Sequence, residues 1–511
     1  MKKVKILDCT LRDGGYYTNW NFSAEVVKNY LLAMENLPID YIEVGYRNLP
    51  QEKYYGEFFY CPTSTIDNLN KLTKTPLAII LNERDMSISD IEMLLKPCQD
   101  KVRMVRMAID PKNLSSAIQK AKKIKNMGFE TAFNVMYLSE WIENYDFLDQ
   151  IIGLENHVDF FYMVDSFGAV YPSQIKPLLN EIKQRTTVKL GFHGHNNLEL
   201  AHANSLIALE EGVDIVDSTI LGMGRGSGNL KTELFLSSLS RSYSLDINFN
   251  SLSKVLEDFQ ALKVEYKWGT NLPYMLAGIH SIPQKQIMEW LGKKFYSFNS
   301  IVSALNNKIQ KTETTSFKTL TTNNKYKKAL IIGGGISITN HVIALKQFIK
   351  VEKDLILIFS SSRHLNYFNQ NSRAQFICLV GNENERLSQF DEKLNNTNFV
   401  IPSAPREIGT FIPNGFEDIT FELDEIEFTN ENKASHCSVS IQTAITLGLE
   451  KVFIAGFDGY INQSKGSRER ELFHENEVIF NDAQKSGLLI TSLTPTLYSK
   501  IETQSVYSLI Q

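Results

Sequence analysis

Short apolar runs of strand length alternate with longer amphipathic segments from residue 4 to about residue 245. Segment 198–211 is typical of the amphipathic class, because its apolar residues recur at helical spacing and Gly212 follows as a stop signal. Eight βα units in about 240 residues predict a TIM (β/α)8 barrel, with an open doubly wound sheet as the alternative. The strands are expected at residues 5–7, 41–44, 77–81, 101–108, 131–136, 160–164, 189–192 and 215–220.

The pattern changes after this barrel domain, which we place at residues 1–250. Residues 251–305 predict a helical appendage, and the polar residues 306–327 predict a linker. Residues 328–511 predict a second domain, a Rossmann-like open α/β sheet. Helices are expected at 252–266, 275–280, 284–291, about 336–350 and 438–447, and strands of the second domain at 329–332, 355–359, 376–380 and 452–455.

Composition narrows the class of protein. The 511 residues are 43% hydrophobic and 22% charged, with a net charge of -5 and no basic block, so we expect no nucleic-acid or membrane partner. No apolar stretch reaches the length of about 18 residues that a membrane span needs. The five cysteines are scattered without a CxxC pair, which favours reduced thiols in a cytoplasmic protein. We also expect a homo-oligomer.

Two short motifs that are far apart in the chain carry candidate chemistry. Leu11-Arg12-Asp13-Gly14-Gly15 follows the first expected strand, and His193-Gly194-His195 ends the seventh. Two histidines two positions apart point to the same face of a strand, which in a barrel is the interior. Two imidazoles and one carboxylate leave coordination positions open for water and substrate. The motifs therefore predict a divalent metal site at the barrel mouth, although an isolated His-x-His can also be purely structural.

Further short motifs occur in the expected barrel, and together with the two above they lie at residues 10–14, 42–45, 165–168, 191–196 and 222–229. In these motifs and in their order, the chain to about residue 300 resembles the metal-dependent superfamily of 3-hydroxy-3-methylglutaryl-CoA lyase, isopropylmalate synthase and 4-hydroxy-2-oxovalerate aldolase. The continuation into the helical appendage looks most like the aldolase branch.

The resemblance implies a role for each matching residue. Asp13, His193 and His195 would hold the metal, with Asn229 as a further ligand, and Mn²⁺ or Mg²⁺ is expected. Arg12 would bind the oxygen that becomes an enolate, because a guanidinium and a metal ion together stabilise negative charge on a keto oxygen. Ser166 is a candidate for the substrate carboxylate. Glu43, inside the second strand, either orients Arg12 or only supports the barrel.

One departure from the family concerns the general base. The aldolase branch has a catalytic His four residues after the Arg, where this chain has Tyr16. A tyrosine is ordinarily a weak base at neutral pH, so His280 or Tyr274 of the appendage are further candidates for the site. The aromatic residues at 14–20 suggest a pocket for a sugar-like aldehyde.

The motifs and the resemblance together predict an aldolase that makes or cleaves the carbon–carbon bond between pyruvate and an aldehyde. We expect it to act in cell-surface carbohydrate biosynthesis. Two alternatives remain open: an acetyl-CoA-dependent Claisen condensation, although Gly15 stands where the synthases typically have Glu, and a non-catalytic scaffold for a carbohydrate pathway.

The second domain gives weaker signals. Gly333-Gly334-Gly335 forms a tight turn between a strand and the N-terminus of a helix, and a helix N-terminus is a natural anion site. The third glycine of a dinucleotide fingerprint is missing, because Ile338 stands there. Segment 449–460 resembles bacterial sialyltransferase-like proteins faintly. We expect this domain to bind a nucleotide, a sugar derivative or a partner.

Overall fold

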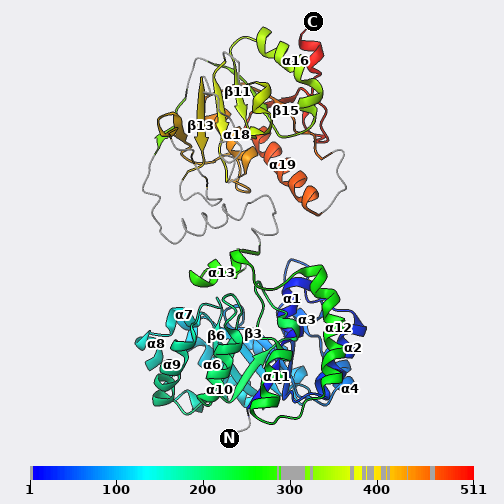
Figure 1. The fold of residues 1–511 in the computed structure, drawn as a ribbon, viewed down its shortest axis with the longest axis vertical. Helices are drawn as coiled ribbons and strands as arrows, with labels where there is room; N and C mark the ends of the chain where they lie inside the picture. The colour runs from blue at the N-terminus through cyan, green and yellow to red at the C-terminus, as the bar shows by residue number, and fades with distance from the viewer. Residues whose placement is uncertain are drawn as a thin grey trace. The chain divides into compact units, whose positions relative to one another are not determined.

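The computed structural model describes residues 4–284, 287–288, 317–322, 326–368, 373–381, 387, 396–403, 410, 412, 415–433, 435–460 and 467–510. The chain divides into two compact units, Met1–Met288 and Glu289–Gln511. Each unit is built on its own parallel sheet (Figure 1).

The first unit is a closed barrel of eight parallel strands, so the predicted TIM barrel is confirmed. The barrel closes between the first and the last strand, where Lys5 pairs with Ile215. Most of the strands are buried on both faces, which explains their nearly continuous apolar runs. The strands are β1 (Lys5–Asp8), β2 (Tyr41–Tyr46), β3 (Leu77–Asn82), β4 (Met104–Ile109), β5 (Glu130–Val135), β6 (Phe160–Asp165), β7 (Lys189–Gly194) and β8 (Ile215–Ser218).

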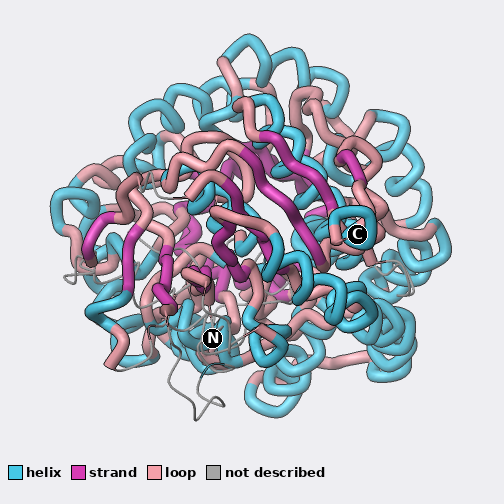
Figure 2. Tube along the Cα trace, turned by 90° about the horizontal axis from the view of Figure 1, so that it is seen from above, coloured by secondary structure: helices cyan, strands magenta, loops and turns pink. Residues whose placement is uncertain are grey.

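Helices alternate with these strands along the chain, cyan against magenta in Figure 2. The α-helices are α1 (Thr10–Thr18), α2 (Ala24–Glu35), α3 (Glu57–Tyr60), α4 (Thr63–Leu72), α5 (Ile88–Leu95), α6 (Leu114–Asn126), α7 (Leu138–Trp141), α8 (Tyr145–Asp149), α9 (Pro172–Arg185), α10 (Ala201–Glu210) and α11 (Thr232–Ser242). Short 3₁₀ turns lie at η1 (Glu83–Asp85), η2 (Lys96–Cys98), η3 (Pro111–Asn113), η4 (Leu154–Asn156) and η5 (Ile220–Gly222).

The barrel interior is a filled core. Side chains from the strands pack inside it, among them Leu7, Met104, Phe160 and Tyr162. A filled interior leaves the carboxyl ends of the strands as the place for a site.

The predicted helical appendage begins with α12 (Phe249–Tyr266) and α13 (Leu272–Ile279). The segment that contains α13 packs on the loop after β7, because Asn197 donates to the carbonyl of Tyr274 at 2.9 Å and accepts from Gln284. Residues 284 and 287–288 of the helix predicted at 284–291 are helical, and the rest of that prediction lies outside the described residues.

The second unit has a parallel sheet in the order β17-β16-β15-β10-β11-β12-β13-β14-β9, so the predicted open α/β sheet is present. Its strands are β9 (Lys318–Thr319), β10 (Lys328–Ile332), β11 (Leu355–Phe359), β12 (Gln375–Cys378), β13 (Thr397–Ile401), β14 (Thr420–Glu422), β15 (Lys451–Ala455), β16 (Leu489–Ser492) and β17 (Glu502–Thr503). Its described helices are α16 (Ser337–Val351), α18 (His436–Thr446) and α19 (Ser467–Lys485), with 3₁₀ turns η6 (Ser362–Tyr367), η7 (Glu417–Ile419) and η8 (Val506–Leu509).

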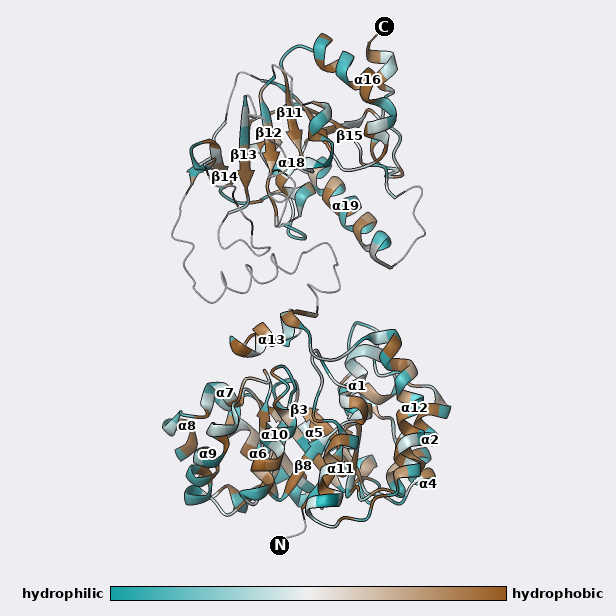
Figure 3. Ribbon diagram, in the orientation of Figure 1, coloured by the Kyte–Doolittle hydropathy of each residue, from teal (hydrophilic) through white to brown (hydrophobic). Residues whose placement is uncertain are grey.

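Alternate side chains of the central strands pack to opposite faces of this sheet. Leu330 and Ile332 of β10 pack with α16, whereas Ala329 and Ile331 pack with α18 and α19. Figure 3 shows brown and teal residues alternating along α19, as expected of a helix with one buried face.

The polar segment predicted as a linker contributes to the second sheet. Lys318–Thr319 forms the edge strand β9, which pairs with β14. Residues 306–316 and 323–325 of that predicted linker lie outside the described residues. None of the described helices has the length and apolar character needed to cross a bilayer.

Candidate metal-dependent active site

The first motif lies in helix α1, directly after β1. Asp13 is in the first turns of the helix and is 1% exposed, where the positive end of the helix dipole favours a carboxylate. The two glycines after it allow close packing. A Cβ on Gly15 would lie 2.1 Å from Cδ1 of Trp20, and one on Gly14 would lie 2.6 Å from Sδ of Met223.

The second motif ends β7, and both of its histidines are buried and oriented by hydrogen bonds. His193 Nδ1 lies 2.8 Å from Oδ2 of Asp217, and His195 Nδ1 lies 2.9 Å from the carbonyl oxygen of Asp165. A carbonyl or carboxylate oxygen accepts, so both Nδ1 atoms carry the proton. In a neutral imidazole Nε2 then keeps a lone pair, as in histidines that bind a metal with support from a neighbouring oxygen.

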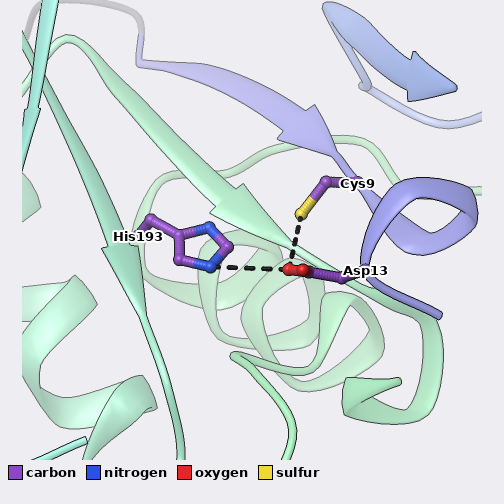
Figure 4. A group of neighbouring side chains, drawn as sticks. All are labelled: Cys9, Asp13 and His193. Carbon is purple, nitrogen blue, oxygen red and sulfur yellow. Dashed lines mark hydrogen bonds and ion pairs between the residues drawn. The ribbon is translucent and has the colours of Figure 1, made fainter. Parts of the chain in front are cut away.

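The structure brings Asp13 and His193 together. Oδ2 of Asp13 lies 3.5 Å from Nε2 of His193, and Sγ of Cys9 lies 3.8 Å from the same oxygen (Figure 4). Ligand atoms of these three residues all lie within 4.8 Å of one another. His195 is adjacent, with its ring centroid 5.0 Å from that of His193. Cys9 was not among the ligands predicted from the sequence, because a lone cysteine after a strand gives no signal.

Asp13 and His193 of this cluster also belong to a closed ring of charged and polar side chains. Each member contacts the next, in the order Arg12, Glu43, Arg106, Asp217, His193, Asp13 and back to Arg12. Glu43 accepts from Nε of Arg12 at 2.8 Å and from Nη1 of Arg106 at 3.0 Å. Glu43 thus joins Arg12 of α1 to Arg106 of β4.

Arg106 and Asp217 are functional candidates that the sequence analysis missed. Arg106 lies inside the otherwise apolar strand β4, Asp217 follows two apolar residues in β8, and both are almost fully buried. A lone charge in such a strand is a usable signal, because a buried charge must be paired. The sequence does not tell which strand provides the partner.

The cluster fits a divalent cation. Burial alone would raise the pKa of Asp13, but Arg12 and the histidines lower it to about 2, so the carboxylate is ionised. Burial and the neighbouring His193 lower the pKa of His195 to about 3, so this imidazole is neutral. Asn229 donates to Oδ2 of Asp13 at 2.6 Å, while its own Oδ1 is buried without a hydrogen-bond partner. An ionised carboxylate, a neutral imidazole and an unsatisfied amide oxygen are all ligands that a divalent metal ion accepts.

Tyr16 and Ser166, two further residues predicted for the site, have well-defined contacts. The hydroxyl of Tyr16 lies 2.9 Å from that of Tyr46. The hydroxyl of Ser166 accepts from the backbone N–H of Tyr137 at 2.9 Å, so it stabilises the loop after β6 and retains its own proton to donate.

Tyr274 and His280 lie on the appendage. Tyr274 is buried against Tyr17 through a side-chain hydrogen bond, and burial raises its pKa to about 12. His280 is the half-buried C-cap residue that follows α13. Within the described part of the chain, no contact joins either side chain to Asp13 or His193.

The helix N-terminus in the second domain is occupied by the chain's own carboxylate. Asp458 accepts from the backbone N–H of Ser337 at 2.9 Å and from the Ser337 hydroxyl. A Cβ on Gly335 would lie 2.6 Å from the Asp458 carboxylate. The anion site expected after Gly333-Gly334-Gly335 is therefore filled internally, which argues against a phosphate at this position.

Comparison with known proteins agrees with the geometry of the barrel. The model of the HMGL-like family matches residues 83–258. A 4-hydroxy-2-oxovalerate aldolase of Carboxydothermus hydrogenoformans is 30% identical over 268 residues, which are 52% of this chain and 79% of that protein. The aldolase of the same name from Geobacillus thermodenitrificans is 28% identical over 248 residues, 47% of this chain and 70% of that protein.

A solved structure is similar to the first unit. It is described as "the N-terminal domain of a putative aldolase from Bacteroides vulgatus" and is 50% identical, with a TM-score of 0.57, covering 59% of this chain and all of that one.

Proposed function

This chain belongs to the HMGL-like family, near its 4-hydroxy-2-oxovalerate aldolases, and from that premise we propose that its barrel makes or cleaves the carbon–carbon bond between a 2-oxo acid and an aldehyde. Pyruvate is the proposed 2-oxo acid. The observation that carries the proposal is the ring that holds Arg12 next to Asp13 and His193. An enolate-forming reaction needs this combination of a cationic hydrogen-bond donor and candidate metal ligands.

Asp13, His193, His195 and Asn229 would hold the divalent cation, with Mn²⁺ or Mg²⁺ expected, and that cation would supply Lewis acidity to the keto group. Arg12 contributes a guanidinium that two carboxylates fix in place, because Glu43 accepts from its Nε and Asp13 from its Nη1. A fixed guanidinium can donate to the keto oxygen as negative charge develops there, without reorganising during the reaction.

Tyr16 is our proposal for the group that moves the proton. In the cleavage direction the aldol hydroxyl loses its proton, the carbon–carbon bond breaks, and its electron pair forms the enolate, which then takes up a proton on carbon. Tyr16 stands four residues after Arg12, and its hydroxyl shares a hydrogen bond with that of Tyr46. This pair can pass a proton from one phenol oxygen to the next, as a general acid–base group requires.

Deuterium incorporation into the methyl group of pyruvate, followed by NMR in D₂O with Mn²⁺ or Mg²⁺, tests the enolate half-reaction. We expect exchange that a chelator abolishes. Arg12→Lys should slow it by at least tenfold, since a lysine keeps the charge but loses the planar fork. Arg84→Lys is the matched control, because Arg84 is an exposed arginine of the same barrel. Absence of exchange with every metal would refute the proposal, and release of CoA from acetyl-CoA would favour Claisen condensation.

A further inference from the structure

Arg225 differs from the two arginines of the charge ring in having no carboxylate partner. Arg12 and Arg106 each pair with two carboxylates. Within the described part of the chain, no ion pair involves Arg225, and its Nε is buried without a hydrogen-bond partner. Its guanidinium carbon lies 5.0 Å from the centroid of the Tyr16 ring, in a cation–π contact. A half-buried cation without an anion is costly, so an anion from solution would stabilise it.

The position of Arg225 ties it to the candidate active site. It lies in the loop between η5 and α11, and four residues later the same loop provides Asn229, which donates to Asp13. Its ring contact is with Tyr16, the proposed proton-transfer group.

The backbone around Arg225 is held in place. The carbonyl of Arg225 accepts from the N–H of Gly228 at 3.2 Å, and the carbonyl of Gly226 accepts from the Tyr17 hydroxyl at 2.9 Å. Gly226 and Gly228 both have positive φ, of 66° and 81°, which side chains rarely adopt. A fixed loop that projects a guanidinium is pre-organised for binding, because little order must be gained when the anion arrives.

We propose that Arg225, supported by the Tyr16 ring, binds a carboxylate or phosphate group on the aldehyde substrate. This inference rests on the proposed function and names the substrate class: an anionic aldehyde. The 2-oxo acid is not the intended partner, because Arg12 and the metal cluster already match its keto and carboxylate oxygens. A guanidinium suits either anion, since two of its N–H groups can bind two oxygens at once.

Matched pairs of aldehydes test the proposal. D-Glyceraldehyde 3-phosphate with D-glyceraldehyde tests phosphate, and succinic semialdehyde with butanal tests carboxylate. Calorimetric titration without pyruvate measures binding apart from turnover. We expect the protein to bind the anionic member of at least one pair ten or more times more tightly. The pair that shows the preference identifies the anion.

Arg225→Gln should reduce that binding ratio by at least tenfold. In condensation with pyruvate, the loss should fall on KM for the anionic aldehyde rather than on kcat. Arg225→Lys should restore part of the preference, which a merely structural role would not predict. Arg84→Gln, at an exposed site, is the control for loss of one positive charge.

The outcomes separate this inference from the proposed function. Equal binding of both members of each pair by the wild-type protein would overturn the inference, as would a preference that Arg225→Gln leaves unchanged. A rise in KM for pyruvate instead of the aldehyde would also overturn it. Failure of pyruvate to exchange deuterium would refute the proposed function alone, because calorimetry still reports on the anion site.

Discussion

Asp217→Asn is the perturbation that tests the charge ring most directly. Asp217 is 2% exposed, accepts from Nδ1 of His193 at 2.8 Å and pairs with the buried Arg106. The amide removes one negative charge and weakens the hydrogen bond that fixes the imidazole. Both effects lower affinity for a cation at His193, so they add rather than cancel.

The expected magnitude follows from the role of Asp217 as a support for a candidate ligand. Loss of such a supporting partner costs about 10- to 100-fold in metal affinity, which corresponds to about 1.4–2.7 kcal/mol. Folding stability should fall too, by up to about 3 kcal/mol, because Arg106 keeps only Glu43 as a counter-charge.

Calorimetric titration with Mn²⁺ measures the affinity, and thermal unfolding measures the stability. Glu83→Gln is the matched control: Glu83 is a carboxylate of the same barrel, 3% exposed and paired with buried Lys120. It should lower stability but change Mn²⁺ affinity less than twofold. Wild-type Mn²⁺ affinity in Asp217→Asn, or equal losses in both variants, would refute the claim that Asp217 positions His193.

Three further predictions concern other parts of the chain. Asp13→Ala should abolish Mn²⁺ binding in the same titration, and retained binding would remove Asp13 from the ligand set. Gly15→Ala should lower the free energy of unfolding by about 1–3 kcal/mol, because the new methyl group meets Trp20; an unchanged melting temperature would contradict this. Asp458→Ala should cost about 0.5–2 kcal/mol, since Ser337 at the start of α16 loses its acceptor; denaturant unfolding that matches wild type would count against that capping role.

The barrel could be predicted because its strands are buried on both faces and therefore differ from the amphipathic helices between them. Helix α1 could not be predicted from the sequence, because Gly14 and Gly15 are poor helix formers. Packing overrides that preference: both positions lie too close to Met223 and Trp20 for any side chain. The edge strand β9 was missed for a related reason, since its two exposed residues carry no apolar pattern and only pairing with β14 defines them.

Residues of the candidate site could be predicted where one short motif contained the reactive side chain and also lay at the end of a strand. Arg12, Asp13 and His193 lie together as the motifs and the strand order required. The pairing of Arg106 with Asp217 depends on how the strands are placed across the barrel, and no local sequence pattern contains that information. Tyr274 and His280 show the opposite case, because their chemistry suggested a role that their described contacts do not support.

The charge ring also explains why this barrel tolerates several buried charges near its mouth. Three carboxylates and two guanidinium groups leave one net negative charge when His193 is neutral. A divalent cation would reverse that sign and give the ring one net positive charge, which favours the anionic enolate of the proposed reaction. Since Asp13 and Asp217 contact opposite nitrogens of the same imidazole, their effects on metal binding must be coupled. Substitutions at the two positions should therefore be non-additive, as expected for residues that share one partner.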